Sequence, residues 1–112
     1  MAGYFELKRS ASGNFMFNLK AGNHETILTS ETYGSKAAAE NGIDSVRRNA
    51  VEDSNFERKT AKDGSAYFTL KSPANGQIIG KSEMYASPSS RDGGIASVMR
   101  NAVTGKIKDK TG

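Results

Sequence analysis

The chain contains one ten-residue segment twice. "GIDSVRRNAV" occupies residues 42–51, and "GIASVMRNAV" occupies residues 94–103; the two differ at only two positions. In both segments the apolar residues fall three and four positions apart, a spacing that places them on one stripe of an α-helix. A repeated amphipathic helix predicts that the chain around it is repeated as well.

The repeat extends over nearly the whole 112-residue chain. Three further pairs of segments match at an offset of 51 residues, which becomes 52 after one extra residue in "SPANGQ": 5–8 with 56–59, 17–20 with 68–71, and 30–33 with 82–85. We interpret this as a tandem duplication. A unit of this size is marginal alone. We therefore expect a single compact domain, 1–112, made of repeats at about 3–52 and about 54–108.

Each repeat has the pattern of three strands followed by one helix. Phe, Leu and Ile alternate with polar residues in six segments, as in half-buried strands: 4–8, 15–20 and 26–30, then 55–59, 66–71 and 78–82. Glycines at Gly13 and Gly64 mark hairpin turns. Strands joined by such short turns form an antiparallel meander.

The helices have recognisable starts. Ser35 and Ser87 stand at the N-cap positions, and Pro88 occupies the first helical position, where its missing N–H costs nothing. Gly42 and Gly94 lie inside the helices, where glycine is unfavourable. Their recurrence predicts a close packing contact of the backbone; the alternative is a hinge or a ligand approach.

Together these elements predict an α+β fold. Two tandem β3-α-β repeats share one antiparallel sheet, both helices pack on one face, and the halves are related by a pseudo-twofold axis. A short final strand is expected around Ile107. The phenylalanines of both repeats and the two helix stripes then form a common core, so each repeat completes the other.

The repeated pattern resembles the YegP-like family, small bacterial tandem-repeat proteins of uncharacterised function. Four segments and their counterparts from Phe56 onward carry the resemblance: Phe5–Lys8, Phe17–Ala21, Ser30–Tyr33 and Gly42–Asn49. The resemblance implies two β3-α-β units in one sheet with exchanged C-terminal strands. "NFERK" (55–59) would then close the first unit and open the second. It implies no catalytic or binding residues. The chain departs from the pattern at the second helix start, "SPSSRDGG" (87–94), where helix propensity is weaker.

Composition narrows the class of protein. The chain has no Cys, no apolar run long enough for a transmembrane helix and no apolar leader after "MAGYFELKRS", so we expect a cytoplasmic protein. The formal net charge is +4 and the pI about 9.4. The basic residues are interspersed with acidic ones, which is typical of an ordinary soluble domain as well as of a weak polyanion binder.

Signatures of catalysis are sparse, and we expect no enzyme, no cofactor and no metal. His24 is the single histidine and falls in a turn, where exposure to solvent is the expected state. One histidine without cysteine does not make a typical zinc site. Glu31 and Glu83, which are related by the duplication, are one candidate carboxylate pair. Each precedes a helix, so a bond to the backbone or the helix dipole explains it better than catalysis does.

The face opposite the phenylalanines is the candidate surface for a nucleic acid or a protein partner. Alternation places on it the following residues: Tyr4, Lys8, Lys20, Lys59, Tyr67 and Lys71. Lysines and aromatic rings on an open sheet bind single-stranded nucleic acid, but Glu–Lys pairs also keep an ordinary sheet face solvated. Sheet edges recruit a further strand or a second copy. The preferred hypothesis is a non-catalytic binding module, plausibly a monomer.

Overall fold

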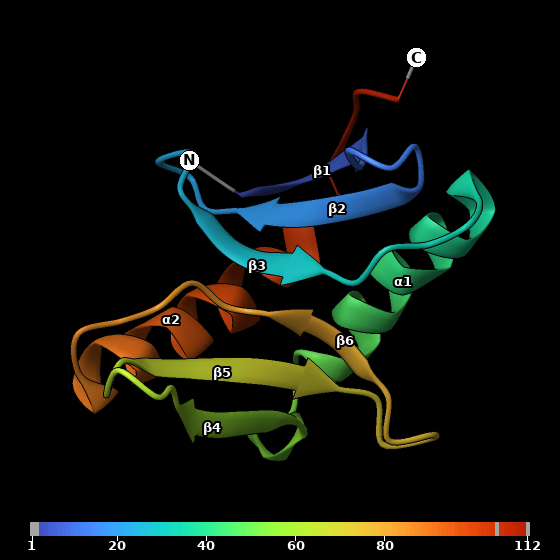
Figure 1. The fold of residues 1–112 in the computed structure, drawn as a ribbon. Coiled ribbons are helices and arrows are strands. Elements are labelled where there is room, and N and C mark those ends of the chain that lie inside the picture. Colours follow the sequence, from blue (N-terminus) through green and yellow to red (C-terminus); the bar gives the residue numbers. More distant parts are fainter. Residues whose placement is uncertain (1–2, 105, 112) are drawn as a thin grey trace.

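The computed structural model describes residues 3–104 and 106–111 of the chain (Figure 1). The elements follow in the order β1 (Tyr4–Arg9), β2 (Phe15–Lys20), β3 (Thr26–Ser30), α1 (Lys36–Asn49), η1 (Asp53–Asn55), β4 (Phe56–Thr60), β5 (Ala66–Lys71), β6 (Ile78–Lys81), α2 (Pro88–Asn101), η2 (Ala102–Thr104) and β7 (Ile107–Asp109). The predicted strands and helices are confirmed, with shifts of one residue at some ends.

The three strands of each repeat form the expected antiparallel meander. The turn glycines Gly13 and Gly64 have φ angles of 87° and 88°, the left-handed conformation that their hairpins require. The strand order in the sheet is β4-β5-β6-β3-β2-β1-β7. The two meanders therefore join edge to edge through β3 and β6, and the order of the six meander strands is symmetric about that seam.

The last strand makes the sheet mixed, whereas the sequence predicted an antiparallel one. β7 lies beside β1 and runs parallel to it, with Ile107 opposite Phe5. The reason lies at the end of α2, where Asn101 Oδ1 accepts a hydrogen bond from the N–H of Gly3 at 3.0 Å. The chain thus returns to the start of β1 before β7 begins, and both strands enter the sheet from the same end.

The implied exchange of strands is seen for β7 and not for "NFERK". Asn55 belongs to η1, and β4 begins at Phe56. Within residues 3–104 and 106–111, β4 pairs with β5 and with no strand of the first repeat. The expectation that residues 55–59 also close the first repeat is therefore wrong, because these residues are committed to the second meander.

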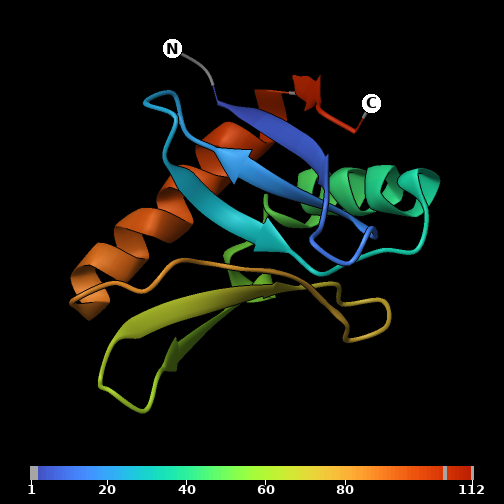
Figure 2. The same cartoon turned by 45° about the horizontal axis from the view of Figure 1, so that its top comes forward.

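Both helices cover the same side of the sheet (Figures 1 and 2). Ser35 and Ser87 cap them as predicted, each hydroxyl accepting a backbone N–H at 3.1 Å. Each helix contacts strands of both repeats: α1 lies on β1, β2, β5 and β6, and α2 lies on β2, β3 and β5. The buried apolar side chains of both repeats form one core cluster as a result.

The helix glycines are explained by packing. A Cβ atom on Gly42 would lie 2.5 Å from the hydroxyl oxygen and 2.8 Å from Cζ of Tyr33, and Gly94 has the same relation to Tyr85. The tyrosines stack on Phe17 and Phe68 with ring centroids 6.3 and 6.4 Å apart. Each tyrosine thus fills the space between its sheet and the helix backbone, which confirms the predicted close packing contact.

Candidate binding face

The side of the sheet away from the helices is formed by the residues that alternate with the buried phenylalanines. Directly paired residues on neighbouring strands project to the same side. One such row crosses the seven described strands: Lys108, Glu6, Asn18, Thr29, Lys81, Thr69 and Glu57, from β7 to β4. We call the surface that contains this row the open face. It is continuous across both repeats.

The structure places the six predicted surface residues on the open face: Tyr4, Lys8, Lys20, Lys59, Tyr67 and Lys71. The two aromatic rings are less accessible than expected. Tyr4 is only 7% exposed; its hydroxyl lies 3.1 Å from His24 Nδ1, and Lys108 Nζ lies 4.2 Å from its ring centroid. Tyr67 is half-buried, with Lys81 Nζ 5.0 Å from its ring centroid. A cation therefore already occupies one side of each ring.

Two lysines of the open face were missed from the sequence. Lys81 lies two residues after the buried Ile79, so simple alternation predicts that both side chains point to the core side of the sheet. In the structure Leu70 pairs with Gly80 and Lys71 pairs with Ile78, so Ile79 is an extra residue in a β-bulge, which resets the alternation. Lys108 was missed because only Ile107 indicated the last strand. The same bulge occurs beside Ile27 in the first repeat, so it is a feature of both copies.

The strands of the open face carry an excess of positive charge. Its strands contribute two glutamates, Glu6 and Glu57, and six lysines: Lys8, Lys20, Lys59, Lys71, Lys81 and Lys108. The whole chain has 16 basic and 12 acidic residues, which leaves ten of each elsewhere. The strands of the open face thus carry four more lysines than glutamates, and Glu31 and Glu83 lie at its seam beside Lys81.

Each glutamate of the open face lies beside at least one lysine. Lys71 Nζ and Lys59 Nζ lie 3.3 and 3.7 Å from the Glu57 carboxylate, which also accepts a hydrogen bond from Thr69 Oγ1 at 3.3 Å. The hydrogen bond from Lys71 is the largest cause of a lowered pKa of Glu57. Glu6 lies 4.0 Å from Lys8. Lys20, Lys81 and Lys108 have no ion pair among the salt bridges of the described residues, and so their charge is available to a ligand.

A hollow of about 350 Å³ lies at the seam between the repeats, where β3 and β6 end. Symmetry-related residues line it: Thr29, Ser30 and Glu31 from the first repeat, and Lys81, Ser82, Glu83 and Met84 from the second. The structure therefore brings Glu31 and Glu83 to one place, as the duplication suggested. Both residues are exposed.

Buried serines shape both rims of this hollow. Ser30 Oγ accepts the N–H of Phe17 at 2.9 Å and donates to the carbonyl of Glu31 at 2.7 Å. Ser82 repeats this with Phe68 at 2.9 Å and Glu83 at 2.8 Å. Burial, followed by the nearby carboxylates Glu31 and Glu83, raises the pKa of Tyr33 and Tyr85. The pattern Ser-Glu-x-Tyr, which both repeats share at residues 30–33 and 82–85, thus has a structural explanation in the strand-to-helix connection.

His24 occupies an exposed turn, as predicted, with a positive φ of 69°. Among residues 3–104 and 106–111, no group of three or more His, Asp or Glu side chains is arranged to hold a metal ion. In the same part of the chain, neither helix is long and apolar enough to cross a membrane.

Comparison with known proteins gives consistent matches. A family model described as a domain of unknown function, DUF1508, matches residues 10–57 and again residues 61–109. The chain is 58% identical to a UPF0339 protein of Bordetella pertussis, over 99% of this chain and 98% of that protein. It is 56% identical to UPF0339 protein YegP of Escherichia coli K12, over 99% of this chain and 100% of that protein.

Two solved structures share the fold. The solution NMR structure of yegP from E. coli superposes with a TM-score of 0.94 at 56% identity, covering 100% of this chain and 96% of that one. The solution NMR structure of a UPF0339 protein from Shewanella oneidensis gives a TM-score of 0.92 at 50% identity, covering 99% and 93%. Both are described as proteins of unknown function or by family number alone, so the surface chemistry has to indicate the role.

Proposed function

Because the chain belongs to the UPF0339/YegP family of bacterial proteins, with the DUF1508 domain in two tandem copies, and the family name describes no activity, we propose its function from its surface chemistry. The proposed function is that of a non-catalytic cytoplasmic binding module. Its open face binds a flexible polyanion such as single-stranded nucleic acid. The observation that carries the proposal is the excess of six lysines over two glutamates on the strands of the open face.

The type of ligand follows from how the charges are arranged. Lysine is a point charge on a flexible stem and contacts phosphate without reading a base. Three of the six lysines lie in each half of the sheet when Lys108 on β7 is counted with the first repeat. An extended strand that crosses the seam would therefore meet lysines along its length. Because both tyrosine rings already contact lysine, base stacking contributes less than phosphate contact.

Two features support a role in binding rather than catalysis. The paired carboxylates Glu31 and Glu83 are exposed in an open hollow. Raising a carboxyl pKa for acid–base catalysis requires burial or a close like charge. In addition, the serines and tyrosines beside them are already used in hydrogen bonds and packing.

The direct test is the salt dependence of binding to a single-stranded oligonucleotide, measured by fluorescence anisotropy. Each neutralised phosphate of a single strand contributes about −0.7 to the slope of log K against log salt, so six lysine contacts predict a slope of about −4. Lys20→Glu with Lys71→Glu removes two contacts at equivalent positions of the repeats. The slope should then become about −3, with weaker binding at every salt concentration.

The matched control is Arg48→Glu with Arg100→Glu, which makes the same change in net charge on exposed positions of the helices. This variant should bind nearly as tightly as the natural chain. Salt-insensitive binding, or equal loss of affinity in both double variants, would contradict a polyanion site on the open face.

A further inference from the structure

The duplication presents the same sheet edge in two different surroundings. β1 opens the first repeat, and its outer edge carries β7 as a parallel strand. β4 is its counterpart in the second repeat. Of the strands in the described part of the chain, only β5 pairs with β4, and the outer edge of β4 is an end of the sheet (Figure 1). The first repeat therefore serves as a template for what fits beside β4.

The β1–β7 contact defines this template. Three residue pairs are in register: Phe5 with Ile107, Glu6 with Lys108, and Leu7 with Asp109. The N–H of Phe5 donates to the carbonyl of Lys106 at 2.8 Å, and the N–H of Lys110 donates to the carbonyl of Leu7 at 2.7 Å. A short strand with few bonds thus suffices to pair with this edge.

Transferring the template to the second repeat gives complementary charges. The counterparts of Phe5, Glu6 and Leu7 are Phe56, Glu57 and Arg58. A strand placed as β7 is placed would set its first residue beside the aromatic ring of Phe56, its second beside the carboxylate of Glu57 and its third beside the guanidinium of Arg58. The pattern apolar, basic, acidic places an opposite charge beside Glu57 and beside Arg58, although Glu57 already contacts Lys59 and Lys71 and Arg58 already contacts Asp53 and Asp92.

We propose that the outer edge of β4 binds an extended peptide segment of a partner protein, parallel to β4, with an apolar, a basic and an acidic residue at three successive positions. This is recognition by strand addition, in which backbone hydrogen bonds supply affinity and alternate side chains supply specificity. The site borders the open face and shares Glu57 with it, but the backbone pairing along β4 does not depend on the function proposed for that face.

The backbone of β4 has the required phase. Ser10 donates to Asn14 at 2.6 Å beyond β1, and Ala61 donates to Ser65 at 2.8 Å beyond β4, so the two hairpins alternate in the same way. Leu7 turns its backbone N–H and C=O away from β2 and toward the outer edge of the sheet. The equivalent alternate positions in β4 are Arg58 and Thr60, which turn their N–H and C=O groups outward in the same way. At Phe56 the N–H is already bonded to the carbonyl of Asp53, so the incoming strand forms one bond fewer at its start.

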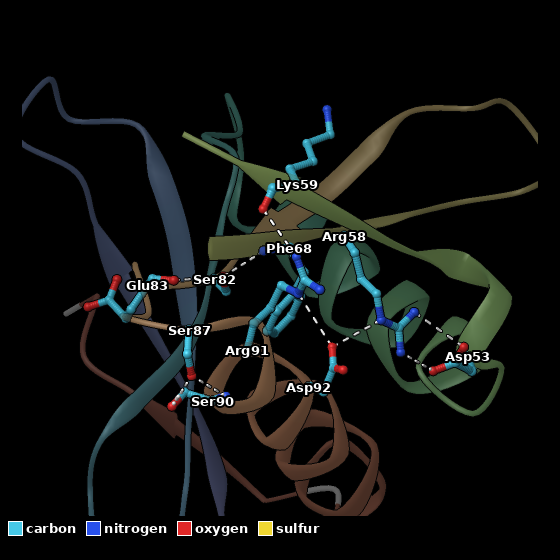
Figure 3. Close-up of polar contacts among 10 residues, drawn as sticks. All are labelled: Asp53, Arg58, Lys59, Phe68, Ser82, Glu83, Ser87, Ser90, Arg91 and Asp92. Carbon is cyan, nitrogen blue, oxygen red and sulfur yellow. Dashed lines mark hydrogen bonds and ion pairs between the residues drawn. The ribbon is translucent and has the colours of Figure 1, made fainter. Parts of the chain in front are cut away.

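Arg58 is positioned to select an acidic residue. Its counterpart Leu7 is fully buried beside β7, whereas the Arg58 side chain is 37% exposed. Figure 3 shows it between two carboxylates: Nη2 lies 3.0 Å from Asp53 Oδ1, and Nε lies 3.1 Å from Asp92 Oδ1. These contacts hold the guanidinium in place. A guanidinium has five N–H donors, and Asp53 and Asp92 use three of them.

On the open-face side of β4 there is room for the basic residue of the incoming strand. In the first repeat Lys108 extends over the ring of Tyr4. The counterpart of Tyr4 is the smaller Asn55, and a hollow of about 290 Å³ is lined here by Asn55, Glu57 and neighbouring residues of β5 and its following turn. The Glu57 side chain is 40% exposed against 18% for Glu6. A lysine or arginine from the incoming strand would reach its carboxylate through this hollow, next to Lys59 and Lys71, which already contact it.

The test uses a synthetic peptide of residues 104–112, Thr-Gly-Lys-Ile-Lys-Asp-Lys-Thr-Gly, added to the isotope-labelled full chain. We expect chemical-shift changes at the amides of residues 56–60 and smaller ones at 4–9. A peptide with Asp109→Lys should bind about fivefold more weakly, since it sets like charges side by side. In the protein variant Arg58→Glu this preference should reverse, and in Arg58→Gln it should reverse more weakly, because Asp53 and Asp92 remain beside the third position. Arg48→Glu should leave the preference unchanged.

Three results would overturn the proposal. The first is the absence of shift changes at residues 56–60, and the second is a peptide preference that does not depend on residue 58. The third is that the amides of residues 56–60 shift with protein concentration alone, in which case the occupant is a second copy of the chain and not a partner protein.

Discussion

At the scale of single residues, glycine and tyrosine at the helix–sheet contact are one unit. Gly42 and Gly94 are unfavourable residues for a helix, but their lack of a side chain lets the rings of Tyr33 and Tyr85 lie against the helix backbone. The chain includes its own control, because Gly93 precedes Gly94 in α2, is exposed, and has nothing within 4 Å of an added Cβ.

Adjacent glycines should therefore respond oppositely to alanine. Gly93→Ala should raise the free energy of unfolding by about 1 kcal/mol, the propensity difference between the two residues. Gly94→Ala should lower it by about 1 to 3 kcal/mol because the methyl group displaces Tyr85. Urea denaturation measures both. Equal stabilisation by the two substitutions would show that the ring does not restrict this position.

The buried serines at the strand ends make a second residue-scale prediction. Ser30→Ala and Ser82→Ala each leave a buried backbone N–H without its acceptor, which should cost about 1 to 3 kcal/mol in the free energy of unfolding. Ser89→Ala, at an exposed helical position, should change it by less than about 0.5 kcal/mol. A cost for Ser82→Ala as small as that for Ser89→Ala would remove the structural explanation of the repeated motif.

Residue patterns predicted most of the core and part of the candidate face. Alternation placed Phe5, Phe17, Leu19 and their counterparts correctly, because regular strands have a period of two. It failed at Lys81, because a bulge adds a residue without a distinct signal in side-chain type. The covered state of Tyr4 was also missed, since it depends on Lys108 from a strand on the opposite end of the chain.

At the scale of elements, packing overrides weak local propensity. The second helix begins with "SPSSRDGG", yet α2 and α1 both have 14 residues. The Ser87 cap and Pro88 define its start, and Ile95, Val98 and Ala102 bury its apolar stripe as Ile43, Val46 and Ala50 do in α1. Most helical stability in proteins comes from such an apolar face.

The last strand is tied to a helix by an ion pair between Lys36 at the start of α1 and Asp109 in β7. The hydrogen bond from Lys36 is the largest cause of a pKa of Asp109 far below the usual range, followed by those from Thr111. A carboxylate with a lowered pKa in the folded state adds stability above its unfolded pKa of about 3.9, and that stability is lost as the pH falls through the folded value.

Removing the lysine should therefore raise the pKa of one carboxylate. In Lys36→Gln we expect the pKa of Asp109 to move up toward its ordinary value, and the variant to lose stability at neutral pH but not at pH values where Asp109 is protonated in both proteins. The pKa of Asp63 is lowered by the backbone N–H of Ser65, a local cause, and should stay the same. An NMR titration of both carboxyl groups decides this; an unchanged Asp109 would mean that β7 is not held by Lys36.

At the scale of the whole molecule, the two repeats are halves of one core. The seam itself is narrow, with two registered pairs between β3 and β6, Thr29 with Lys81 and Ser30 with Gly80. The larger connection is made by the helices, which lie across strands of both repeats, and by β7, which pairs with the first repeat. The duplication predicted the shared core. The sequence also predicted a short strand around Ile107, but not that it would lie parallel to β1, because that pairing breaks the symmetry of the two copies.

The mutual completion of the repeats is most directly tested with residues 1–53 expressed alone. The account predicts no cooperative thermal transition for this fragment as a monomer, measured by circular dichroism with the mass checked by sedimentation, because its half of the core and the seam edge of β3 would be exposed to water. Ordered structure should appear only on self-association or on addition of residues 54–112. A monomeric fragment that melts cooperatively would contradict the shared core.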